Sequence, residues 1–201
     1  MIAALTGMGL SAAAGFNAYI PFLVVALVAR FTDLIALPSE FTWIESWWAI
    51  GIGAVLLAAE LIVDKIPAID TLNDTIATFI RPSMGGLIFA ATSSAAKLDS
   101  STWMGDHPWV GVALGVLVSG LVHSGKMAAR PVVNAGTAGF GAPVVSTMED
   151  SASLGLSIVA LVAPILTVIA LLLIFGTLGY VFYRYLLWRR GRHERDQASL
   201  A

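Results

Sequence analysis

Residues 2–29 read IAALTGMGLSAAAGFNAYIPFLVVALVA and contain no charged side chain. A helix of roughly 20 apolar residues is long enough to cross the hydrocarbon core of a bilayer. Four further stretches, 46–59, 82–96, 107–125 and 151–183, also lack Asp, Glu, Lys and Arg. The apolar residues are continuous and do not alternate with polar ones, so the pattern indicates membrane helices and not a transmembrane barrel.

The composition of the whole chain supports a membrane protein. Of 201 residues, 58% are hydrophobic and 12% are charged, with a mean hydropathy of +0.85. Soluble domains have about a quarter charged residues, so a soluble fold is excluded. There is no Cys, and the three His are scattered. We therefore predict no disulfide, no metal site and no cofactor.

The fold predicted from these runs is all-α: a polytopic transmembrane bundle of five or six helices. Five apolar segments are expected, at 3–30, 45–64, 80–97, 107–126 and 151–187. The third is rich in Gly, Ala and Ser, which let helix backbones approach closely, so we place it inside the bundle. Residues 1–188 would form one membrane domain, and 189–201 a basic cytoplasmic tail.

Charge predicts the orientation. The stretches 31–45 and 98–106 hold acids without Lys or Arg, whereas Lys65, Arg81, Lys126 and Arg130 mark the opposite, cytoplasmic side. Five crossings that start inside would then leave the C-terminus outside. This conflicts with the positive-inside rule, because the C-terminus is rich in Arg. A sixth crossing resolves the conflict, either at 132–148 or by a break at Pro164. We favour six crossings with both ends cytoplasmic, and five remain the alternative.

The chain also resembles itself at an offset of 61 residues. Trp48, Lys65 and Pro82 fall on Trp109, Lys126 and Pro143. This match predicts an internal repeat, with units at about 48–97 and 109–158 and with helices broken by Pro. Repeats with interrupted helices are common in transporters, where the interruptions often mark the binding site.

Ionisable residues near the membrane are the candidates for chemistry. Glu60 and Asp64 share one helical face, as do His123, Lys126 and Arg130, and we predict that the acidic and basic groups meet. Structural pairing is the alternative to a functional site. Glu149 and Asp150 lie inside the membrane if 137–163 crosses it; otherwise they begin the last helix, where the helix dipole favours acids. The candidate substrate or ion site comprises Asn17, Glu60, Asp64, Lys65, Asp70, Asn73, Arg81, His123, Lys126, Arg130, Asn134, Glu149 and Asp150.

Two other features concern the first helix and the tail. Asn17 and Pro21 interrupt the first apolar run, which predicts a kink whose freed carbonyl needs a partner. In the tail, Arg189, Arg190 and Arg192 are expected to bind anionic lipid headgroups, and no nucleic-acid partner is predicted. No catalytic residue is predicted, because no nucleophile stands beside a base in a known arrangement.

Three stretches resemble one protein family. They are Leu5–Pro21, Glu60–Asp70 with Arg81-Pro82, and Ala142–Ser146 with Glu149-Asp150. Together they are similar to bacterial members of domain-of-unknown-function family 4126, over nearly the whole chain up to about residue 175. The resemblance implies a small multi-pass protein of the cell inner membrane and no particular activity.

The sequence leaves several function classes open. A small transporter or channel-like permease of unknown substrate, assembled as a homo-oligomer, fits the repeat, the Pro-broken helices and the charge clusters. A lipid-handling or membrane assembly protein without a transport pathway fits the small-residue helices and the basic tail. An intramembrane enzyme is disfavoured. A continuous polar cavity would favour transport, and a lateral groove open to lipid would favour lipid handling.

Overall fold

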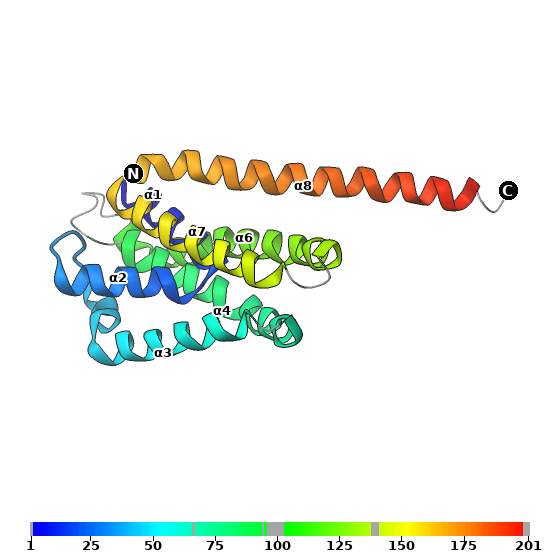
Figure 1. The fold of residues 1–201 in the computed structure, drawn as a ribbon. Helices are drawn as coiled ribbons and strands as arrows, with labels where there is room; N and C mark the ends of the chain where they lie inside the picture. Colours follow the sequence, from blue (N-terminus) through cyan, green and yellow to red (C-terminus); the bar gives the residue numbers. More distant parts are fainter. Residues whose placement is uncertain (1, 66, 94, 96–102, 138–140, 199–201) are drawn as a thin grey trace.

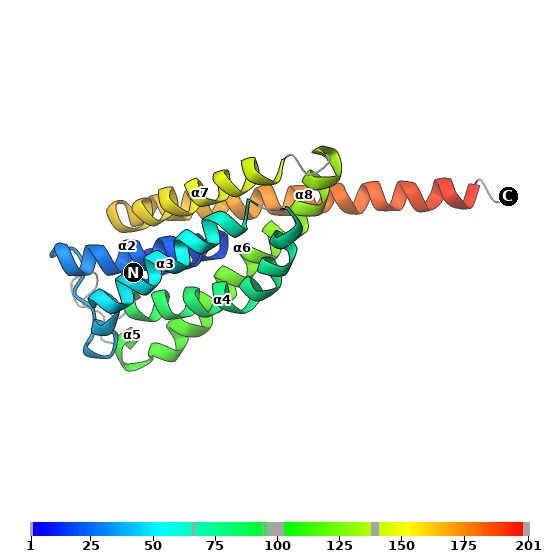
Figure 2. The ribbon, with the colours of Figure 1, turned by 60° about the horizontal axis from the view of Figure 1, so that its bottom comes forward.

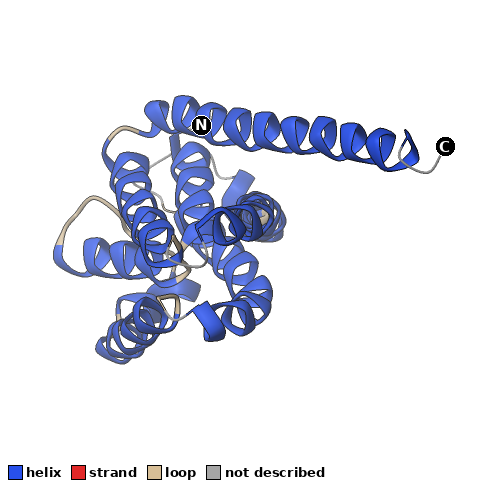
Figure 3. Cartoon of the chain, turned by 45° about the vertical axis from the view of Figure 1, so that its right-hand side comes forward, coloured by secondary structure: helices blue, strands red, loops and turns tan. Residues whose placement is uncertain are grey.

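The structure, a computed structural model, describes residues 2–65, 67–93, 95, 103–137 and 141–198. Every secondary-structure element in these residues is helical (Figure 3), as predicted. The side chains of 67–72, 74, 104–105, 131–136, 178, 181–182 and 185–198 are not described. The elements are α1 (Ile2–Phe16), α2 (Tyr19–Phe31), the 3-10 helix η1 (Ser39–Glu45), α3 (Trp47–Val63), α4 (Pro67–Ser93), α5 (Trp103–Asp106), α6 (Pro108–Thr137), α7 (Ala142–Val162) and α8 (Pro164–Ala198).

The first apolar run folds into two helices that form a hairpin. From the N-terminus α1 runs into the bundle, and α2 returns toward the same end (Figures 1 and 2). Leu10 of α1 and Val25 of α2 accordingly lie in one buried apolar cluster. The prediction of a single first helix at 3–30 is therefore wrong.

The residues at the break explain the reversal. Asn17 accepts hydrogen bonds from the backbone N–H groups of Tyr19 and Ile20, so its side chain caps the start of α2. Pro21 lies in the first turn of α2, where its missing N–H costs no helical hydrogen bond. The prediction of a kink at Pro21 is therefore wrong. The helix breaks at Asn17–Ala18, and Pro21 belongs to the next helix, α2.

Helix α1 lies at the centre of the bundle, packed against α4, α6, α7 and α8. Its buried surface consists mainly of Gly, Ala and Ser, which allows close backbone approach. A Cβ atom added at Gly15 would lie only 2.7 Å from the carbonyl oxygen of Ser119 on α6. The second half of α4 is also buried, with Ile88 and Phe89 fully enclosed, as predicted for the small-residue segment.

The last apolar run is divided at Pro164. Helix α7 ends at Val162 and α8 begins at Pro164, a first-turn position that suits proline. The other candidate sixth segment, 132–148, is not one helix, because α6 ends at Thr137 and α7 begins at Ala142. Two described helices, at Pro108–Arg130 and Ala142–Val162, are long and apolar enough to cross a membrane, or three if the bent pair η1–α3 counts as one span.

The two ends of the chain lie at opposite ends of the molecule. The N-terminus lies beside the start of α8, and the C-terminus lies at the far end of this helix (Figure 1). Helix α8 has 35 residues, or about 52 Å at 1.5 Å per residue. The hairpin adds one change of direction that the sequence did not predict. The structure therefore does not support the predicted placement of both ends of the chain on one side.

The predicted internal repeat is not confirmed by the helix boundaries. Both supposed units pair two antiparallel helices, α3 with α4 and α6 with α7 (Figure 2). However, Lys65 follows the end of α3, whereas Lys126 lies well inside α6. The break points therefore differ at the matched positions.

Replacement of Gly15 by Ala tests the close packing around α1. The new methyl group would overlap α6, and overpacking typically costs about 1–3 kcal/mol. We expect Gly15→Ala to lower the thermal unfolding temperature in detergent. Gly51→Ala is the control, because a Cβ there meets no atom within 4 Å. Equal unfolding temperatures for Gly15→Ala and the wild type would contradict the packing described.

Candidate functional site

Asp64, at the end of α3, is the meeting point of side chains from two other helices. Its Oδ2 lies 3.6 Å from Nη2 of Arg81, 3.7 Å from Nζ of Lys126 and 3.6 Å from Nη2 of Arg130. Its Oδ1 accepts a 2.6 Å hydrogen bond from Nδ2 of Asn73. One carboxylate therefore links α3 to both α4 and α6.

Helix α7 contributes a second carboxylate, which forms ion pairs with the basic residues of α6. Oε2 of Glu149 lies 2.9 Å from Nζ of Lys126 and 2.8 Å from Nη2 of Arg130. Glu149 is buried on α7, midway along the apolar region predicted for 137–163. It is therefore not an acid at the start of the last helix but a member of the buried cluster.

Arg81 of α4 joins the cluster to Glu60 of α3 and His123 of α6. Its Nη2 donates to Oε1 of Glu60 at 2.7 Å, and its Nη1 lies 3.3 Å from Nδ1 of His123. Because a guanidinium cannot accept, Nδ1 must be the acceptor. In a neutral imidazole Nε2 then carries the proton, and it lies 3.1 Å from the hydroxyl of Thr78.

The hairpin between α1 and α2 reaches this cluster with its tip. Nζ of Lys126 donates to the carbonyl oxygen of Phe16, the last residue of α1, at 3.3 Å. Nδ2 of Asn17 donates to Oδ1 of Asp150 at 2.9 Å, and the hydroxyl of Ser153 donates to the carbonyl oxygen of Ala13 at 2.9 Å. The Phe16 carbonyl, freed by the break, is thus satisfied by a side chain of α6, and the Ser153 hydroxyl of α7 also lies 3.4 Å from the Asn17 carbonyl oxygen.

The resulting ion cluster is buried. Among the described side chains, its ion pairs join three cations and three carboxylates: Arg81, Lys126, Arg130, Glu60, Asp64 and Glu149. Each of the six is at most 9% exposed, and Arg81 is fully buried. Charges removed from water require mutual pairing, which this arrangement supplies across four helices.

Most of the predicted site residues come together here. The acids Glu60, Asp64, Glu149 and Asp150, the polar residues Asn17, Asn73 and His123, and the bases Arg81, Lys126 and Arg130 all join this network. Lys65 does not: it is exposed, and its Nζ donates to the carbonyl oxygen of Leu61. The side chains of Asp70, Asn134, Arg189, Arg190 and Arg192 lie outside the described residues.

Sequence reasoning missed the serines that hold the backbones together. Besides Ser153, Ser119 of α6 donates to the carbonyl oxygen of Arg81, and Ser11 of α1 to that of Gly85. Serine is frequent in these helices and often donates to its own helix, so the sequence carries no signal that selects these three. No group of three metal-ligating residues suited to an ion occurs in the part of the chain that the structure describes.

A lateral crevice runs between α2, α3 and α4 beside the ion cluster. Its outer part, about 350 Å³, is bordered by Trp43, Phe22 and Met84, and its inner part, about 180 Å³, reaches Glu60 and Arg81. Tyr19 and Leu56 line both parts.

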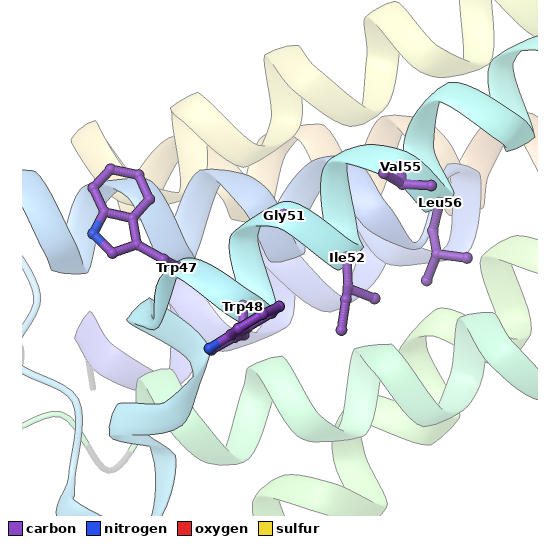
Figure 4. Close-up of a pocket in the computed structure, with 6 residues that line it drawn as sticks. All are labelled: Trp47, Trp48, Gly51, Ile52, Val55 and Leu56. Carbon is purple, nitrogen blue, oxygen red and sulfur yellow. The ribbon is translucent and has the colours of Figure 1, made fainter.

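The outward surface of α3 that leads to this crevice is apolar. Trp48, Ile52 and Leu56 follow one another along α3 (Figure 4), and all three are exposed. They also line the outer part of the crevice. Helix α3 buries only Gly53 and Glu60, so it stands at the edge of the bundle, where Gly53 lies close to Phe22 and Leu23 of α2.

The apolar helices, the central small-residue helix and the buried ion cluster define a helical membrane protein. The family model described as Domain of unknown function (DUF4126) matches residues 4–184. The chain belongs to this family, as its three characteristic stretches indicated. No curated protein and no solved structure matches it significantly.

Removal of the Asp64 charge tests whether the ion cluster stabilises the fold. Asp64→Asn would leave three cations against two carboxylates, and breaking a buried pair costs about 3–5 kcal/mol. We expect a marked loss of thermal stability. The double variant Asp64→Asn, Arg130→Gln restores the charge balance and should recover part of that loss.

The control for this prediction is Glu40→Gln, because Glu40 is exposed in η1. It should unfold like the wild type. Additive losses of stability for Asp64→Asn and Arg130→Gln in a double-mutant cycle would contradict the coupling of these two residues.

Proposed function

We propose that the chain crosses the membrane five times, through α3, α4, α6, α7 and α8, with α1 and α2 as a re-entrant hairpin. Helices α3, α6 and α8 all run toward the end of the molecule where the C-terminus lies (Figure 1). Lys65, the basic residues of α6 and the Arg-rich tail are therefore grouped at this end, which the positive-inside rule assigns to the cytoplasm. The acidic stretch 31–45 lies at the opposite end, and with it the N-terminus.

We infer further that the protein is a small carrier of the cell inner membrane. The main support for this inference is the contact between the broken helix and the buried ion cluster. Transporters commonly place substrate sites where a discontinuous membrane helix meets polar groups of its neighbours. Here the tip at Asn17 contacts Lys126 through the adjacent Phe16 carbonyl, and Asp150 directly. Catalysis is not part of the proposal, since the hydroxyls of Ser119 and Ser153 donate to backbone carbonyls.

A lipid-handling role is the second candidate, favoured by the lateral crevice. Its walls are mainly apolar, and it borders the exposed face of α3.

In either role we propose that two or more copies assemble, because about 200 residues are few for one complete pathway. Anionic lipids are the proposed partners of Arg189, Arg190 and Arg192.

Cysteine labelling tests the five-crossing topology, and the absence of native Cys removes any background. Single cysteines would replace Ile2, Ser39 and Gln197 in three separate variants. In intact cells a membrane-impermeant maleimide should label the first two and reach the third only after permeabilisation. Protection of Ile2→Cys together with labelling of Ser39→Cys would contradict the hairpin topology.

Solute flux into proteoliposomes tests the carrier function. A panel of neutral polyols, amino acids and monovalent cations would be followed by stopped-flow light scattering. We expect at least one solute to enter faster than into protein-free vesicles. The balanced variant Asp64→Asn, Arg130→Gln should remain folded but lose this flux, because it removes two groups of the site.

The same vesicles distinguish the two candidate roles. Accelerated movement of fluorescent lipid between leaflets, with no solute flux, would replace the carrier with the lipid-handling function. If the balanced variant transports as well as the wild type, the ion cluster serves the fold alone.

A further inference from the structure

We propose that the outer face of α3 binds one phospholipid of the surrounding membrane, with the phosphate on Arg30 and an acyl chain in the groove that begins at Trp47. The site lies at the N-terminal end of α3, whereas the ion cluster reaches this helix at Glu60 and Asp64, near its C-terminal end. The residues of the lipid site are not members of that cluster, so the inference does not depend on the carrier function.

The groove follows the surface of α3 and has a volume of about 600 Å³. It is bordered by six exposed residues of this helix (Figure 4): Trp47, Trp48, Gly51, Ile52, Val55 and Leu56. They form two rows at intervals of four residues, and residues at this interval lie on the same face of a helix. Gly51 leaves a gap in the first row, between Trp47 and Val55, and a Cβ atom added there would meet no atom within 4 Å.

The length of the groove matches one leaflet of a bilayer. From Trp47 to Leu56 the helix rises about 14 Å, at 1.5 Å per residue. Half of the hydrocarbon core of a bilayer is about 15 Å thick. Trp side chains prefer the headgroup level of a membrane. With Trp47 and Trp48 at that level, the groove runs inward beside the acyl chains of a single leaflet.

A cation stands at the headgroup end of the groove. The guanidinium carbon Cζ of Arg30 lies 4.1 Å from the centroid of the Trp47 ring, and the ring of Phe31 contacts the same side chain edge-on. Nη1 of Arg30 also donates to the carbonyl oxygen of Glu45 at 2.8 Å. These contacts position the guanidinium, while Arg30 remains exposed. Its planar set of five N–H donors suits the oxygens of a phosphate.

An apolar groove with a cation at its end selects a phospholipid. An apolar helix from a second copy would cover the groove but leave the charge of Arg30 unmatched, and the side chains of Trp47 and Trp48 would hold its backbone away. A diacylglycerol would fill the groove but has no phosphate. A phospholipid supplies both parts, and in a membrane it surrounds this face of α3 at high concentration.

Native mass spectrometry tests the site on the full-length protein. The protein would be delipidated in a mild detergent and incubated with dioleoyl phosphatidylethanolamine or with dioleoylglycerol, which has the same chains and no phosphate. We expect one molecule of the phospholipid to be retained per chain. Dioleoylglycerol should be retained roughly tenfold less, because a hydrogen bond between charged groups is stronger than one between neutral groups.

Two pairs of variants give matched comparisons. Arg30→Gln should lower retention of the phospholipid roughly tenfold, whereas Lys65→Gln removes an exposed cation at the other end of α3 and should leave it unchanged. Gly51→Leu fills the gap in the groove and should also lower retention. Gly155→Leu adds the same volume on α7, at another exposed glycine whose Cβ would meet no atom within 4 Å, and should have no effect.

Photocrosslinking in nanodiscs locates the bound molecule, with a phospholipid that bears a diazirine in one acyl chain. Crosslinks concentrated on residues 47–56 would support the site. Crosslinks spread evenly over the apolar surface, or equal retention by the wild type and Gly51→Leu, would overturn the inference. Equal retention of the phospholipid and dioleoylglycerol would refute the role of Arg30. A dimer that Gly51→Leu dissociates, with unchanged lipid retention, would assign the groove to a second copy instead.

Discussion

The reversal of the chain at Asn17–Ala18 is the constraint on which the rest of the structure depends. A chain that turns back inside an apolar helix bundle exposes backbone N–H and C=O groups away from water, and these groups need other partners. Asn17 caps the first turn of α2, Lys126 binds the carbonyl oxygen of Phe16, and Ser153 lies within hydrogen-bond distance of that of Asn17. Such a turn is stable only when α6 and α7 surround it, and α1 accordingly lies at the centre of the bundle.

The ion cluster follows from the same constraint. A lysine that serves a backbone carbonyl deep in the bundle must have its own charge balanced, and Asp64 and Glu149 do so from α3 and α7. Asp64 also faces Arg81 and Arg130, so the position of α3 depends on the cluster at one end. Along most of its length α3 packs loosely against α4. The crevice between these helices is therefore a consequence of how α3 is attached.

Much of this site could be predicted from the sequence, but the hairpin could not. The spacing of Glu60 and Asp64 placed two acids on one helical face, and that of Lys126 and Arg130 placed two bases on another. The structure pairs Asp64 with both bases. Residues 2–29 have the length of one membrane span, so their hydrophobicity predicts a single helix and not a turn. The available signal was Asn17 followed closely by Pro21, because a capping residue and a first-turn proline mark the start of a new helix.

The distance between Ile2 and Phe31 tests the hairpin most directly. Both residues are exposed, and the chain has no native Cys, so spin labels can be attached at two introduced cysteines. A single continuous helix would separate these positions by about 44 Å, at 1.5 Å per residue. Two helices folded back at Asn17 predict a distance below about 30 Å by pulsed electron paramagnetic resonance in nanodiscs. A distribution centred near the longer value would contradict the account.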